Sequence, residues 1–141
     1  MKTIKQTCNN TCMYCVCAMI SNTSESYVID WFKNYGNGIA LAPEDAMIFL
    51  AHHGCYLASH IKNEDNDMGV NYYAIINFDG FELFICVDSE SFPGLDHVVY
   101  WDGEQLYDPN PNTKRTKLKE YDINYIYPIS RVKRRAKKWK L

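Results

Sequence analysis

The sequence predicts an α+β domain, in which helices come first and antiparallel strands second. Two observations support this class. Up to His52, apolar residues recur at helical spacing between cap residues and glycines. From about Tyr72 onwards, short runs rich in β-branched and aromatic residues alternate with turn sequences. The chain has 141 residues, 47% of them hydrophobic, which is enough for one domain with a buried core.

Three helices are expected in the first half of the chain. The first spans Thr11 to about Ile20, with good cap residues at its start and neither Gly nor Pro inside it. The second spans Glu25–Tyr35, where apolar side chains form one stripe and glycines follow. The third begins after Pro43 and runs to about His52, with two acidic residues in its first turn.

Strands are expected in the second half. Four runs have the composition of strands: Tyr72–Asn77, Phe81–Val87, His97–Trp101 and Glu104–Asp108. Asp102-Gly103 separates the last two runs, and this dipeptide is a strong signal for a two-residue hairpin loop. Tyr125–Ile129 is a further candidate strand. The strands are therefore expected to form an antiparallel sheet on which the helices pack.

The hairpin places a histidine beside a carboxylate. With Asp102 and Gly103 as the loop residues, counting along both strands puts His97 directly opposite Asp108. Directly opposed residues share a face of the sheet, with Cβ atoms about 4.5–5.5 Å apart. The acid would hold the tautomer of the imidazole and stabilise its cationic form. The same pair is compatible with a cross-strand polar contact that has no catalytic duty.

A candidate nucleophile lies at the start of the first predicted helix. Cys12 is placed where the free amide groups and the helix dipole favour an anion such as a thiolate. A thiolate next to an imidazole is the pair used in nucleophilic acyl transfer. Gln6 lies six residues upstream on an extended segment, and its side-chain amide could donate to a developing oxyanion. Cys12 could instead be a small buried apolar residue, as Cys15 and Cys17 are expected to be.

Three segments resemble the C39-type papain-like cysteine peptidases. They are Gln6-Thr7-Cys8-Asn9-Asn10-Thr11-Cys12 with the helix that follows it, Asp96-His97-Val98-Val99-Tyr100, and Tyr107-Asp108-Pro109. The family pattern is a Gln, five residues, a Cys that opens a helix, and later a His strand followed by Asp-Pro. The resemblance implies a papain-like fold and a triad of Cys12, His97 and Asp108. Gln6 would then supply a donor of the oxyanion hole.

Two positions depart from the family pattern. Thr11 and Met13 stand where the family usually has Asp before the cysteine and Gly after it, which leaves an altered substrate or a lost activity open. Three residues are expected to line the substrate site: Met13, Asp96 and Trp101. His60 is an alternative base, and Asn110 is an alternative orienting group. His52-His53, at a helix end, is expected to be structural.

A competing motif overlaps the candidate nucleophile. Cys8, Cys12 and Cys15 have the spacing Cys-x3-Cys-x2-Cys, which resembles the cluster loop of radical S-adenosylmethionine enzymes, where three thiolates hold an iron–sulfur cluster. That family needs a partial α/β barrel, whereas the strands of this chain gather at its end. Zinc is less favoured, because three of the four clustered cysteines, Cys17 included, would lie on one buried helix. The main prediction therefore includes no metal and no cofactor.

Charge is distributed unevenly along the chain. Residues 131–141 hold seven of the 15 basic residues and no acid, so the preceding 130 residues carry eight basic and 17 acidic residues, a net charge of −9. The basic tail is expected either to lie against its own acidic body or to bind an acidic partner such as RNA. If the site is inactive, residues 1–130 would be a binding module that docks through this tail.

The location is predicted to be the cytoplasm. The N-terminus is basic but is followed by no apolar segment of a secretory signal, and no run of 18 apolar residues occurs. Without export, the six cysteines are expected to be reduced thiols, metal ligands or a nucleophile, not a disulfide framework. We therefore predict a small cytoplasmic thiol hydrolase of peptide or isopeptide bonds. A phage or bacterial effector would fit this description.

Overall fold

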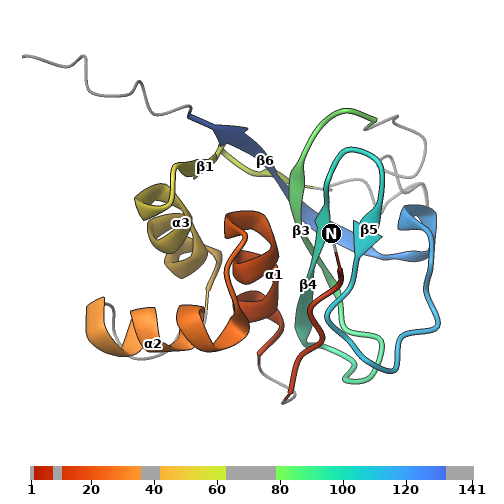
Figure 1. Ribbon diagram of the computed structural model, residues 1–141. Coiled ribbons are helices and arrows are strands. Elements are labelled where there is room, and N and C mark those ends of the chain that lie inside the picture. The colour runs from red at the N-terminus through yellow and green to blue at the C-terminus, as the bar shows by residue number, and fades with distance from the viewer. Residues whose placement is uncertain (1, 8–10, 36–41, 63–78, 133–141) are drawn as a thin grey trace, which may run out of the picture.

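Three helices cover one face of an antiparallel sheet in the computed structural model (Figure 1). The structure describes residues 2–7, 11–35, 42–62 and 79–132. The predicted α+β class, with helices first and strands second, is confirmed. None of the helices in these described ranges is long and apolar enough to cross a membrane.

The helices lie where the apolar periodicity predicted them. They are α1 (Cys12–Ser21), α2 (Glu25–Tyr35) and α3 (Pro43–His52). Helix α1 is the central one, since eight of its residues are buried against the sheet and the other two helices. It ends at Asn22, which adopts a left-handed conformation and closes the last turn through its backbone amide. This burial fixes the direction of α1 and the position of its first residue.

The sheet of the described residues has six strands. They are β1 (Cys55–Leu57), β2 (Ile61–Lys62), β3 (Leu83–Asp88), β4 (Asp96–Trp101), β5 (Leu106–Tyr107) and β6 (Ile123–Arg131). The order is β1-β6-β3-β4-β5, with β2 also paired to β6, and all pairs are antiparallel. The strand expected at Tyr72–Asn77 lies outside the described residues. The sequence did not indicate β1 and β2, which are too short for alternation to be detected.

Each face of the sheet has its own apolar cluster. On the helical face, Phe84, Val98 and Tyr100 pack against α1 and its neighbours. The opposite face holds Val99 and Tyr121 with the alternate residues of β3 and β6, and a 3-10 helix (Leu118–Glu120) leads into the last strand. Because successive side chains of β4 point to opposite faces, the strand contributes to both clusters.

The hairpin between β4 and β5 differs from the prediction. Its loop has four residues instead of two, so Trp101 pairs with Leu106 and Tyr100 with Tyr107. The reason is Asp102, whose carboxylate accepts hydrogen bonds from the amides of residues 104 and 105 at 2.8 and 2.7 Å and thereby widens the turn. His97 is therefore not directly opposite Asp108, as the two-residue loop had predicted. The register moves by two residues, however, which leaves both side chains on the same face.

The last described strand extends into the segment that the charge pattern assigned to the tail. Arg131 ends β6, and its guanidinium donates to both carboxylate oxygens of Glu82, each at 2.7 Å, and to the carbonyl of Ile20 at 2.9 Å. It thus ties β6 to the residue before β3 and to the end of α1. Arg131 belongs to the folded body, and residues 133–141 lie outside the described residues.

Candidate active site

Cys12 is the first residue of α1 and lies beside β4. Thr11 occupies the N-cap position, with a buried side chain that makes no capping hydrogen bond to the helix. The first backbone amides of α1, which have no acceptor within the helix, therefore lie at the end of the helix where Cys12 is placed. The Cys12 side chain is partly accessible, whereas the other described cysteines are buried. A partly accessible thiol at the start of a fixed helix has the exposure that a nucleophile requires.

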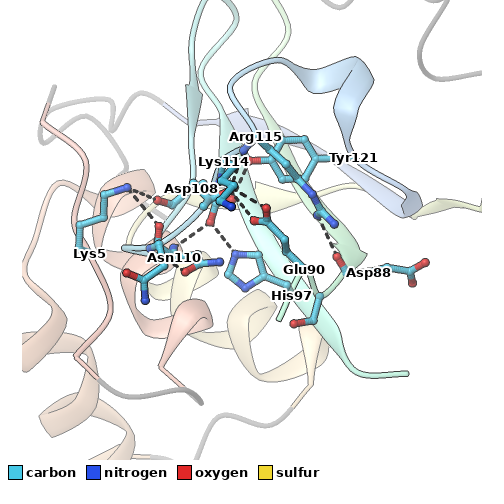
Figure 2. Close-up of polar contacts among 12 residues, drawn as sticks. Lys5, Asp88, Glu90, His97, Asp108, Asn110, Lys114, Arg115 and Tyr121 are labelled. Atoms are coloured by element: carbon cyan, nitrogen blue, oxygen red, sulfur yellow. Dashed lines mark hydrogen bonds and ion pairs between the residues drawn. The ribbon is translucent and has the colours of Figure 1, made fainter. Parts of the chain in front are cut away.

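His97 is the second residue of β4 and is turned toward Asp108 (Figure 2). Its Nε2 atom lies 2.6 Å from Oδ1 of Asp108, and both side chains are buried. Cys12 lies close enough to His97 to contribute, with Asp108, to the raised pKa of the imidazole. Since Nε2 is engaged by the carboxylate, Nδ1 is the nitrogen that remains for the thiol. The structure therefore joins His97 to Asp108 and places Cys12 near them.

Asp108 is held by three donors. Besides His97, the Tyr121 hydroxyl donates to Oδ2 at 2.6 Å and the backbone amide of Asn110 donates to Oδ1 at 2.8 Å (Figure 2). Tyr121 is almost fully buried, and the guanidinium of Arg115 lies over its ring, 5.0 Å from the ring centre. The carboxylate thus has its two oxygens occupied and a fixed orientation toward the imidazole.

Electrostatics favour a charged His97–Asp108 pair. Burial alone would lower the pKa of His97, but the hydrogen bonds and charges of Asp108 and Cys12 raise this pKa to about 9. Burial likewise opposes ionisation of Asp108, yet His97, Tyr121 and the Asn110 amide hold its pKa below the usual range. Burial and the hydrogen bond to Asp108 raise the pKa of Tyr121, so its hydroxyl keeps the proton that it donates. At neutral pH the pair is imidazolium and carboxylate.

Gln6 is fixed next to this pair by the chain on both sides of it. Its backbone amide donates to the carbonyl of Pro109 at 2.9 Å, and Lys5 Nζ donates to the carbonyl of Asp108 at 3.0 Å. The Thr7 hydroxyl donates to Glu25 at 3.0 Å, and Glu25 also accepts from the Cys15 thiol at 2.7 Å. The N-terminal segment is thus anchored to the Asp108 loop and to the start of α2, which Cys15 of α1 also contacts, and Gln6 lines the site.

A pocket of about 300 Å³ opens beside His97. Its lining is mostly polar and consists of Gln6, Thr7, Ser89, Ser91, Phe92, Leu95, Asp96, His97, Asn110, Pro111 and Asn112. The pocket contains the predicted residues Gln6, Asp96 and His97. A substrate group bound there would contact the imidazole directly.

Two of the residues predicted to line the site lie elsewhere. Met13, the second residue of α1, is buried in the helical-face cluster. Trp101 is at the other end of β4 from His97, four residues or about 13 Å along the strand. It packs on the apolar cluster of the sheet face that is turned away from the helices. Neither is among the residues that line the pocket.

The alternative side chains also have other contacts. The exposed His60 ring lies edge-on to Tyr125 and tilted to Tyr127, with ring centres 5.1 and 5.5 Å away, so it is not the partner of Asp108. The backbone amide of Asn110 donates a hydrogen bond to the Asp108 carboxylate, and this carboxylate is the group that contacts His97. His53 bonds the Tyr27 hydroxyl at 2.9 Å, as a structural histidine would.

The cysteine motif is dispersed among different partners. Cys15 donates to Glu25 and Cys17 is fully buried, and burial raises the pKa of both thiols. Within the described ranges, no three His, Cys, Asp or Glu side chains are grouped as metal ligands would be. Cys8 lies outside those ranges.

Sequence reasoning missed Tyr121 and Lys5. Tyr121 is 13 residues from Asp108 and Lys5 is 103 residues from it, so no strand register or helical spacing connects them. Tyr121 follows the 3-10 helix Leu118–Glu120 and precedes β6, and nothing in the sequence distinguishes it from the other core tyrosines.

Comparison with known proteins adds no relative. No protein-family model, no curated protein and no solved structure matches this chain. The functional interpretation therefore depends on the geometry of the site.

Proposed function

We propose that this protein is a cysteine peptidase of papain-like design that cleaves peptide or isopeptide bonds. The observation that carries the proposal is the buried His97–Asp108 pair, held by Tyr121, with the partly accessible Cys12 close enough to raise the pKa of His97. A partly accessible thiol, an imidazole and a fixed carboxylate in this order are the parts of nucleophilic acyl transfer. The C39-like order of Gln6, Cys12, His97 and Asp-Pro along the chain supports it further.

The first half of the proposed reaction forms an acyl-enzyme. In the resting site His97 already carries the proton of Cys12 on Nδ1, and the thiolate sulfur attacks the substrate carbonyl carbon. The carbonyl oxygen becomes an oxyanion, which the Cys12 backbone amide and the Gln6 side chain would stabilise. The carbon–nitrogen bond then breaks as His97 gives the proton to the leaving amine. The products are a thioester on Cys12 and a free amine.

The second half regenerates the enzyme. A water molecule gives a proton to His97 while its oxygen attacks the thioester carbon. Collapse of this intermediate breaks the carbon–sulfur bond, the Cys12 sulfur leaves, and the carboxylic acid is released. Asp108 stays ionised throughout and keeps the imidazole aimed at the sulfur. The pocket beside His97 offers room for the departing group. The cytoplasmic location remains a prediction from the sequence.

The experiment is cleavage of a peptide library made by digesting a bacterial proteome and blocking its amino termini. Cleavage creates new amino termini that can be labelled and sequenced by mass spectrometry. The wild-type protein is expected to create them, and Cys12→Ala and His97→Ala are expected to create at least 100-fold fewer. Cys17→Ala is the matched control, because this thiol is buried in the core away from the pocket. Equal cleavage by wild type and Cys12→Ala, or no cleavage by any of them, would count against a peptidase.

A further inference from the structure

The pocket beside His97 lies where the leaving group of the proposed reaction must be. His97 gives its proton to the departing amine, so the substrate residue that carries this amine has to contact the imidazole. Gln6 and His97 both line the pocket, whereas the second residue of α1, Met13, is directed into the core. The pocket therefore receives the residue on the amine side of the cleaved bond. Its chemistry determines which residue is accepted there.

Asp96 gives this pocket a negative charge. It lines the pocket directly before His97, is exposed, and accepts a hydrogen bond from Asn124 Nδ2 at 3.4 Å. Asp88, its directly opposed partner on β3, accepts from the same amide at 2.8 Å. Two carboxylates directly opposite each other repel, which a nearby cation would relieve. Among the described residues, no Lys, Arg or His forms an ion pair with either carboxylate.

Two exposed apolar side chains complete the pocket. Phe92 is 42% exposed and Leu95 is 60% exposed, and both belong to the loop between β3 and β4. Apart from Pro111 the rest of the lining is polar. It includes no Lys or Arg, and the charge of His97 is paired with Asp108. A carboxylate next to exposed apolar surface matches a side chain with a hydrocarbon stem and a cationic end, which is the form of Lys and Arg. An acidic or short polar residue would bury less apolar surface and would be repelled or left without a partner.

We infer that Asp96 is a specificity-determining residue that selects a lysine or arginine on the amine side of the cleaved bond. This inference rests on the proposed peptidase function. In the complex, the carboxylate of Asp96 binds the ammonium or guanidinium group, and Phe92 and Leu95 cover the hydrocarbon stem. An exposed ion pair of this kind stabilises the complex enough to favour a basic residue roughly fivefold over a neutral residue of similar length.

The test uses the amino-terminally blocked peptide library described above. Each new amino terminus reports the residue that stood on the amine side of the cleaved bond. For the wild type, Lys and Arg are expected at these termini roughly fivefold above their frequency in the library. Asp96→Asn is expected to lose the enrichment, and Asp96→Lys is expected to replace it with enrichment of Asp and Glu. Single peptides that differ only at this position, Lys against norleucine, should show the effect in KM more than in kcat.

Asp88→Asn is the matched control. It removes the same charge from the opposed position, which shares Asn124 but does not line the pocket. This variant is expected to keep the basic preference. Wild-type cleavage without basic enrichment, or equal loss in Asp88→Asn and Asp96→Asn, overturns the inference while leaving the peptidase proposal standing. Absence of all cleavage by the wild type overturns both.

Discussion

Tyr121→Phe removes one hydroxyl and little else, so it tests how Asp108 is held in the site. The hydroxyl donates to Oδ2 of Asp108 at 2.6 Å in a buried environment. A hydrogen bond to a charged group contributes about 1.5–3 kcal/mol. One pKa unit corresponds to 1.36 kcal/mol, so losing this bond raises the pKa of Asp108 by about one to two units if the whole effect falls on the ionised form. Phenylalanine keeps the ring beneath Arg115.

The expected result is a shift in the acid limb of Cys12 reactivity. Asp108 stabilises the imidazolium of His97 only while it is ionised, so protonation of the carboxylate weakens the thiolate–imidazolium pair. The pH at which alkylation of Cys12 by iodoacetamide falls to half should therefore rise by about one unit in Tyr121→Phe. The assay is the alkylation rate of Cys12 measured by mass spectrometry across acid and neutral pH, with circular dichroism to establish that the protein remains folded.

Tyr107→Phe is the control for this prediction. Its hydroxyl donates at 3.0 Å to Asp102 in the β4–β5 loop, and the buried Tyr107 side chain neither bonds the Asp108 carboxylate nor lines the pocket. The control should lose stability of a similar order, about 1 kcal/mol, without moving the acid limb. An unchanged acid limb in Tyr121→Phe, or the same shift in both variants, would refute the role of Tyr121.

Three further predictions concern stability and the tail. The pKa of His97 is raised from 6.5 to about 9, so its contribution to the free energy of unfolding should be complete below about pH 6.5 and lost as the pH rises to about 9. The pKa of Asp108 is lowered from 3.8, so its contribution to the free energy of unfolding should be lost as the pH falls below about 4. Urea unfolding at a series of pH values should show both losses of stability, and Asp108→Asn should reduce both. Arg131→Ala should lower the free energy of unfolding by about 1–2 kcal/mol, discounted for the exposure of Arg131, whereas the exposed Lys119→Ala should cost less than about 0.5. Deleting residues 133–141 removes six positive charges and should abolish salt-dependent binding to RNA, measured by fluorescence anisotropy. Alkylation of Cys12 should be unchanged by the deletion. RNA binding that survives the deletion would exclude the tail as its source.

Most of the fold follows from local patterns. The helices carry strong apolar periodicity and clear end signals, which is why Glu25–Tyr35 and the helix that begins at Pro43 match the prediction. The β4–β5 hairpin was predicted with the wrong loop because the Asp102 side chain bonds two backbone amides and lengthens the turn. The face of His97 and Asp108 was nevertheless predicted correctly, since a shift of two residues preserves the alternation of side chains.

The candidate site was predictable only where its residues had local signals. Cys12 was indicated by its place at a helix start, and His97 by its place on a strand. The order of Gln6, Cys12, His97 and Asp108 along the chain was a further signal. The buried donor Tyr121 had none, because its contact with Asp108 is produced by tertiary packing. Trp101 was misplaced for a related reason. An aromatic residue on the same strand as His97 suggested a wall of the cleft, but it lies at the far end of that strand.

The most direct test of the central claim compares the alkylation rates of all six cysteines at about pH 6, where only an activated thiol reacts quickly. Peptide mass spectrometry after brief exposure to iodoacetamide gives a rate for each. We predict that Cys12 reacts at least tenfold faster than the buried thiols such as Cys17 and Cys86, and that His97→Ala slows Cys12 without changing the others. A Cys12 rate equal to that of the buried cysteines, or one that is unaffected by His97→Ala, would contradict the account.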